Sequence, residues 1–480
     1  MFRTTLSAVF TAALLVGCGT PRLAATASEA PPAQWQATLP HGGDAQALAD
    51  WWRRFDDPLV ADLVAEAQRT SPTLAQALAR LAQARAGVRG AAAQRWPSVN
   101  AGAQASRGTN ATSGFVAATT GSAGLDAAWE VDLFGATRAQ VAAAEARGDA
   151  AALGWHGARI SLAADVAAAY VALRACEAQL QVAEQDAASQ RQTATLTGAK
   201  VRVGFEAPAN GALADGAAAD ATNRAIAQRA DCDVLVKGLV VLTGAAEPAL
   251  RTRLAAGTAR LPQPAAFAVG ALPAALLQQR PDIAAAERAL VAAAADVGVA
   301  EAARFPRLTF SGTLALSAWR AGGQTSDGTA WGFGPALVLP IFDGGARAAR
   351  EDAAHARYDE ARAALDERVR RAVADVEEAL VRLDAATRRE GEAERAAQGF
   401  RDFFSAAEQR WRIGAGSLID REDARRTALA AQTALINVQR ERVAAWITLY
   451  RALGGGWSAA DATPRGGSTR AHAVPDAARK

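Results

Sequence analysis

The sequence repeats its own landmarks at an almost constant spacing. The residues that open and close its helical runs recur 209 or 210 positions later: Pro72 with Pro281, Pro97 with Pro306, Val203 with Ile413, and Gly204 with Gly414. A register held over this length indicates duplication of one structural unit. Each copy reads as a helix, two strands and a long helical hairpin. We therefore expect a first repeat at 51–245, a linker at 246–278 and a second repeat at 279–455.

Each copy contains two short segments in which apolar residues alternate with small or polar ones. We expect strands at 98–108, 125–134, 308–317 and 331–342, with loops at 108–122 and 321–328. At about ten residues, these segments have the length of tilted membrane strands. Trp319 and Trp331 flank the second loop, as aromatic residues at a membrane interface do. Four strands cannot close a membrane barrel alone, so the repeat suggests an oligomeric channel.

Long helical patterns follow each pair of strands. Residues 137–203 contain no proline, and a helix of this length spans roughly 100 Å. Residues 345–413 repeat the pattern, and shorter segments at 209–242 and 418–453 return. Apolar residues recur every three or four positions with Glu, Gln and Arg between them, which fits a helical wall around a wet lumen.

The N-terminus has the features of a bacterial lipoprotein signal. Arg3 precedes an apolar segment, and Leu15-Val16-Gly17-Cys18 then places small residues before a cysteine. We expect a signal peptide at 1–17, a covalent lipid on Cys18 and an extended tether at 18–50. Gly19 follows the cysteine in place of aspartate, which in such lipoproteins indicates the outer membrane. The alternative is an ordinary signal peptide with a chance cysteine.

Composition argues against several other functions. After Cys18, no uncharged apolar run reaches the 18 residues of a membrane-spanning helix, so any crossing must use strands. The net charge of +3 is spread without a basic block, which gives no reason to expect nucleic-acid binding. No phosphate-binding or nucleophile motif is present, and we expect neither an enzyme nor a metal site. The four histidines share no metal-ligand spacing: His41, His156, His355 and His472.

The two cysteines beyond Cys18 lie on opposite sides of a predicted helical turn near 204–208. Cys176 precedes that turn by about thirty residues and Cys232 follows it by about twenty-five. Antiparallel helices of equal rise place such residues at similar heights, so we expect a disulfide that joins the hairpin in an oxidising periplasm. Two buried free thiols are the alternative. The segment 456–480, rich in Gly, Ala, Pro and Arg, is expected to be disordered.

Several motifs in order match one known family. They are WWRRFDDPL at 51–59, QRPDIAAAE at 279–287, Phe305-Pro306, Gly334-Pro335 and LPIFDGG at 339–345. The chain resembles the TolC family of outer-membrane efflux lipoproteins, and within it the NodT/OprM-like branch. The resemblance covers about residues 18–456.

The resemblance implies an α+β membrane protein that works as a homotrimer. Each chain would give four strands to one 12-stranded β-barrel in the outer membrane, continued by a long periplasmic α-helical barrel. The channel would passively conduct drugs or other small solutes, supplied by a periplasmic adaptor and an inner-membrane resistance-nodulation-division pump. Two alternatives are a duct for type I protein secretion and a soluble periplasmic coiled-coil lipoprotein. The sequence does not encode the substrate.

The resemblance also assigns roles to the hairpin tips. The family's gate-associated Asp-Ala-x-Arg pattern matches Asp423-Ala424-Arg425-Arg426. A ring of Asp423 side chains, with Asp420 nearby, would narrow the mouth and favour cations, and Arg426 would tie neighbouring helices by ion pairs. The alternative is that these charges form an ordinary solvated helix face. The adaptor would meet the tips at Val203, Gly204, Ile413 and Gly414.

Overall fold

A computed structural model describes residues 51–109, 116–267 and 279–457, together with 32, 35–37, 39 and 48. The expected signal peptide, the lipidation site Cys18 and most of the tether lie outside the described residues. The chain divides into two compact units. In its described part, the first unit holds 78–152 and 284–368, and the second holds 153–283, 369–457 and the residues before 78.

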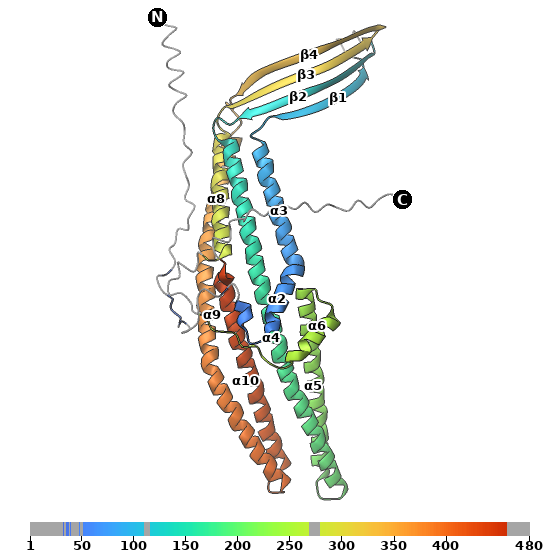
Figure 1. Cartoon of the computed structure of the whole chain (residues 1–480), viewed down its shortest axis with the longest axis vertical. Helices are drawn as coiled ribbons and strands as arrows, with labels where there is room; N and C mark the ends of the chain where they lie inside the picture. The colour runs from blue at the N-terminus through green and yellow to red at the C-terminus, as the bar shows by residue number, and fades with distance from the viewer. Residues whose placement is uncertain are drawn as a thin grey trace. The chain divides into compact units, whose positions relative to one another are not determined.

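The first unit is built on a four-stranded antiparallel sheet in the order β1-β2-β3-β4 (Figure 1). The strands are β1 Ser98–Gly108, β2 Ala118–Val131, β3 Arg307–Ala321 and β4 Gln324–Val338. The central pair joins the two repeats, because β2 of the first copy pairs with β3 of the second from Ala118↔Ala321 to Val131↔Leu308. The outer strands β1 and β4 each have one strand neighbour within this sheet.

Three of the strands extend further into the predicted loops than the sequence pattern indicated. The expected loop at 321–328 is wrong, because Ala321 already pairs with Gln324. Gly322 and Gly323 alone form the turn, with φ of 56° and 84°. Both angles lie in the left-handed region that a tight two-residue hairpin requires. The alternation of apolar and polar residues is hard to recognise at these strand ends, because many of the residues are glycine, serine or threonine.

Proline marks the edge of the sheet. Pro335 lies inside β4 and is opposite Phe310 of β3. A proline within a strand removes a backbone donor, and it is tolerated on an edge strand such as β4. Pro340 follows the end of β4, and the sequence expectation that strand structure continues to residue 342 is wrong by four residues.

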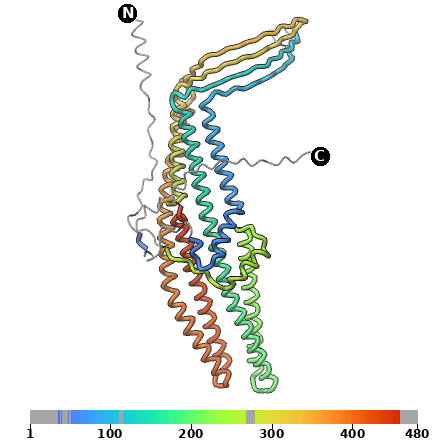
Figure 2. Tube along the Cα trace, in the orientation of Figure 1, coloured from blue at the N-terminus to red at the C-terminus, as the bar shows by residue number. Residues whose placement is uncertain are grey.

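Long helices connect to and follow the strands (Figure 2). Their bounds are α2 Pro58–Thr70, α3 Pro72–Ala93, α4 Ala136–Arg202, α5 Pro208–Thr243, α6 Glu247–Leu254, α8 Pro281–Ala302, α9 Ala346–Arg412 and α10 Leu418–Ala452. α4 and α9 both have 67 residues, as expected for duplicated units. Gly204 and Gly414 follow these helices with φ of 76° and 75°, and such left-handed glycines terminate helices. No helix in the described ranges is long and apolar enough to cross a membrane.

The family-like motif at 51–59 builds the core of the second unit. Trp51, in the short 3-10 helix η2 Trp51–Arg54, is fully buried and stacks on Tyr450 of α10, with ring centroids 5.3 Å apart. Phe267 contacts the same indole edge-on at 5.2 Å. Asp57 caps α2 by accepting a hydrogen bond from the Leu59 amide. Gly456 and Trp457, the first two residues of the expected disordered tail, are ordered, and Trp457 is buried; the rest of that tail lies outside the described residues.

The motif at 279–287 ties the beginning of α8 to α9 and α10. Arg280 is buried and donates to the Ala452 carbonyl at 2.9 Å. Its guanidinium also pairs with Asp282 at 2.9 Å and with Asp375 of α9 at 3.1 Å. Burial lowers the pKa of Arg280, but the two carboxylates together outweigh this effect and raise the pKa above its ordinary value. A charge this deeply buried is tolerated only when it is paired in this way.

Candidate functional site

The predicted gate residues lie at the start of α10, in the second unit. Ser417 caps the helix by accepting a hydrogen bond from the Asp420 amide. Asp420, Asp423 and Arg426 are all exposed on the single chain. Asp423 and Arg426 pair at 3.3 Å with side chains 64% and 79% exposed. An ion pair this exposed contributes at most about 1 kcal/mol, so within one chain it cannot hold α10 in place.

The arginines next to these residues are buried. Arg421 and Arg425 are one helical turn apart on the inner face of α10, and each is nearly inaccessible to solvent. The sequence pattern did not identify them as buried, because charged residues occupy most positions from 420 to 426. Only the tertiary packing shows which face of this charged turn is covered.

Arg425 connects α10 to α4. Its guanidinium lies 3.2 Å from the carboxylate of Asp186 and donates to the Ser189 hydroxyl at 3.1 Å. Glu422 lies 3.4 Å away on the preceding turn of α10. Burial lowers the pKa of Arg425, because a low-dielectric environment disfavours its charged form. Asp186 and Glu422 supply the negative charge that offsets this cost.

Arg421 connects α10 to the end of α9. It pairs with Glu422 at 2.5 Å and lies 3.6 Å from Glu408 of α9. Its guanidinium also stacks over the Trp411 ring at 4.8 Å, and Lys200 of α4 approaches the same ring at 5.3 Å. The indole is thus in contact with cations from both α10 and α4, which adds a cation–π contribution to the ion pairs.

The two arginines and their partners form one network across four helices. Arg224 of α5 pairs with Asp186 at 3.1 Å, and Gln190 of α4 donates to Glu422 at 2.6 Å. A groove of about 520 Å³ runs beside the network, lined by residues of α4, α5 and α10. We call Asp186, Gln190, Glu422, Arg421 and Arg425 the inter-hairpin network. It joins the α4–α5 hairpin to the α9–α10 hairpin near their tips.

The hairpin tips expose apolar side chains. Val203 and Ile413 are 66% and 79% exposed, and Phe205 is also exposed. These side chains lie at the tips because Gly204 and Gly414, with positive φ, reverse the chain after each long helix. Apart from the adjacent residues, no atom of the described chain lies within 4 Å of where a Cβ would be at either glycine. The apolar side chains at the tips are therefore largely exposed on the single chain.

The two remaining predicted site residues, Cys176 and Cys232, are bonded to each other. The disulfide joins α4 to α5, and the two Cα atoms are 5.6 Å apart. Both cysteines are buried. The bond cross-links the two helices of the first hairpin, whereas the second repeat, residues 279–455, contains no cysteine.

Comparison with known proteins agrees with this architecture. The family model described as outer membrane efflux protein matches residues 63–245 and 272–455, one match per repeat. The chain is 30% identical over 465 residues to the pyoverdine export outer membrane protein OpmQ of Pseudomonas aeruginosa, covering 94% of this chain and 97% of that one. It is also 30% identical to outer membrane protein OprJ of the same organism, covering 86% and 88%.

A solved structure of the outer-membrane channel OprN has the same fold. The TM-score is 0.77 at 30% identity, with 92% of this chain and 99% of that chain covered. The agreement extends over the four strands, the long helices and both repeats. The chain belongs to the outer membrane efflux protein family, the TolC family, and is a non-enzymatic outer-membrane channel of efflux pumps that extends into the periplasm.

Proposed function

We propose that the protein acts as a homotrimer, in which three chains combine their strands into one 12-stranded barrel. The single observation that carries this proposal is the sheet, which has β1 and β4 at its two edges. Most side chains on both faces of β1 and β4 are exposed. Backbone groups at an open edge have no partner in lipid, so the sheet must be closed by further copies.

The helices give independent support for self-association. Ile226, Val234 and Val241 of α5 are exposed although apolar, and their spacings of eight and seven residues place them along one helix face. A stripe of this kind is stabilised when a neighbouring helix covers it. In the trimer, α5 of one chain would pack against a helix of the next chain, and the helices would form a periplasmic α-barrel.

We propose further that the channel serves a tripartite pump. A periplasmic adaptor would bind the apolar tips around Val203, Gly204, Ile413 and Gly414, and an inner-membrane pump of the resistance-nodulation-division class would supply the energy. The relatives named for pyoverdine and toluene efflux favour small solutes over proteins as cargo. Conduction through the channel itself would be passive.

In the closed channel, the inter-hairpin network would hold α10 against α4. Asp420, Asp423 and Arg426, exposed at the start of α10, would face neighbouring chains or the lumen and narrow the entrance. The summed negative field of three Asp423 carboxylates around one axis would favour the entry of cations over anions. The lipid on Cys18 would add a second attachment to the outer membrane, independent of the strands.

Chemical crosslinking of the purified full-length protein tests the assembly. We expect a trimer as the largest covalent species, and a dimer or an unlinked monomer as the largest species would contradict the proposal.

Metabolic labelling with radioactive palmitate tests the proposed lipid anchor on Cys18. Label should appear in the wild-type protein and disappear in Cys18→Ser, with Cys176→Ser as a cysteine control that keeps it. Equal labelling of wild type and Cys18→Ser would contradict lipidation at this residue.

A further inference from the structure

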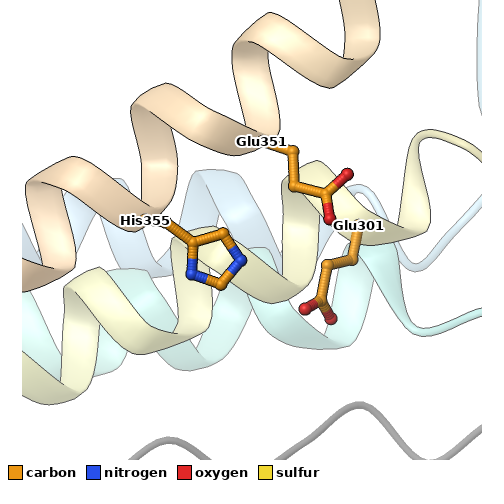
Figure 3. Close-up of side chains that lie close together, drawn as sticks. All are labelled: Glu301, Glu351 and His355. Carbon is orange, nitrogen blue, oxygen red and sulfur yellow. The ribbon is translucent and has the colours of Figure 1, made fainter.

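Two helices of the first unit bring three metal-ligating side chains together (Figure 3). Glu301 comes from the last turns of α8, and Glu351 and His355 come from the start of α9. One donor atom from each side chain lies within 4.8 Å of the other two. We propose that these residues form a binding site for a divalent transition-metal ion of the zinc class.

The chemistry of the donors selects this class of ion. Glu351 and His355 are four residues apart, so they project from the same face of α9, one turn above the other. An imidazole nitrogen with two carboxylates suits Zn²⁺ and its neighbours, whereas Mg²⁺ and Ca²⁺ prefer oxygen ligands alone. Three protein ligands would leave the fourth position of a tetrahedral ion for water or another ligand.

The surroundings leave two of the donors available. All three residues are half-buried. No side chain or amide of the described chain forms a hydrogen bond or an ion pair with the Glu301 carboxylate or the His355 ring. Partly exposed groups of this kind can bond to water, and a metal ion can replace that water, so both donors are available to a ligand.

The third donor is oriented by a neighbouring cation. Arg304 donates to Oε2 of Glu351 at 2.6 Å, which leaves the other carboxylate oxygen able to bind an ion. Hydrogen bonds of this kind to a ligating carboxylate are a regular feature of metal sites. An ion bound with ligand distances of about 2.0–2.1 Å would draw the donors closer than they are here, which the flexible glutamates allow.

The position of the site indicates what a bound ion would do. α8 ends at Ala302 and leads directly into β3, and α9 begins at Ala346 after β4. An ion held by Glu301, Glu351 and His355 would therefore clamp together the two helices that enter and leave the second β-hairpin. Because the ion would bind the folded protein in preference to the unfolded chain, it would stabilise this unit.

Isothermal titration of the untagged, detergent-solubilised protein with Zn²⁺ tests the proposal. We expect one saturable ion per chain in the wild type, weakened by more than about tenfold in His355→Ala and in Glu301→Gln. Asp352→Asn, which removes an exposed carboxylate beside Glu351, and His156→Ala should bind as the wild type does. Excess Mg²⁺ should not displace the Zn²⁺.

Circular dichroism and gel filtration of each variant separate lost binding from lost folding. The Glu301→Gln change conserves side-chain volume, so it tests the site even if His355→Ala is unstable. The proposal is overturned if the wild type shows no saturable binding at Zn²⁺ concentrations up to about 1 mM. It is also overturned if binding persists unchanged in both ligand variants.

Discussion

Arg425 of α10 lies 3.2 Å from Asp186 of α4, and both side chains are nearly inaccessible to solvent. This ion pair links two helices that belong to different repeats. Removing one member of a buried pair typically costs about 3–5 kcal/mol, because the other charge is left without a partner. The pair is therefore suited to hold the two hairpins together while it is intact, and to favour their separation once it is broken.

A double-mutant cycle measures this coupling. We expect Asp186→Leu and Arg425→Leu each to lower the melting temperature of the second unit. The double variant should be more stable than the sum of the single losses, because it leaves neither charge unpaired. Thermal denaturation followed by circular dichroism gives the four values. Strictly additive losses would show that the two side chains do not act as a pair.

Asp423 is expected to set the ion preference of the entrance. Its side chain is exposed, so Asp423→Ala should change the field at the mouth with little effect on folding. We expect the reversal potential in a KCl gradient to shift towards zero, and the double variant with Arg426→Ala to conduct more than the wild type. Asp384→Ala, which removes a half-buried helical aspartate remote from the tips, is the control. A reversal potential equal to that of the wild type would contradict the role of Asp423.

The disulfide should stabilise the first hairpin. It closes a segment with a sequence separation of 56 residues, for which chain-entropy estimates and measured cases give a loss of about 2–4 kcal/mol on removal. Cys176→Ser with Cys232→Ser should melt at a lower temperature than the oxidised wild type. A reducing agent should lower the melting temperature of the wild type to that of the double variant, and it should leave the melting temperature of the double variant unchanged. Free alkylated thiols at both positions in the purified protein would contradict the bond.

Arg280 should be among the least replaceable residues of the second repeat. Arg280→Ala removes a buried cation that serves two carboxylates and a carbonyl, so we expect a loss of about 3–5 kcal/mol. Arg288→Ala of α8 is the control, because Arg288 is half-exposed and lies 3.9 Å from Asp149. That change should cost less than about 1 kcal/mol. Similar melting temperatures for both variants would contradict a structural role for Arg280.

The sequence alone predicted the duplicated architecture, because glycine and proline mark the ends of its helices. Gly204 and Gly414, which the repeat places at equivalent positions, predicted the ends of the two long helices. The first strand was predicted at its observed bounds. The other strands were misjudged at their loop ends. Glycines and small polar residues there obscure the alternation that identifies a strand.

The buried part of the candidate site was beyond sequence reasoning for a different reason. In a turn with charges at most positions, local pattern does not say which charges are covered by a neighbouring helix. The family resemblance points to Asp420, Asp423 and Arg426 in this turn, whereas packing against α4 and α9 buries Arg421 and Arg425. Their partner Asp186 is more than 200 positions away in the other repeat, and only the fold brings it near.

The most direct test of a closed channel held by the inter-hairpin network is single-channel conductance in planar lipid bilayers. The wild type should form discrete channels of low conductance, and Arg425→Ala should form channels of clearly higher conductance. Arg388→Ala, which removes an exposed arginine paired only within α9, should match the wild type. Equal conductance of Arg425→Ala and wild type, or no channels from either protein, would contradict the account.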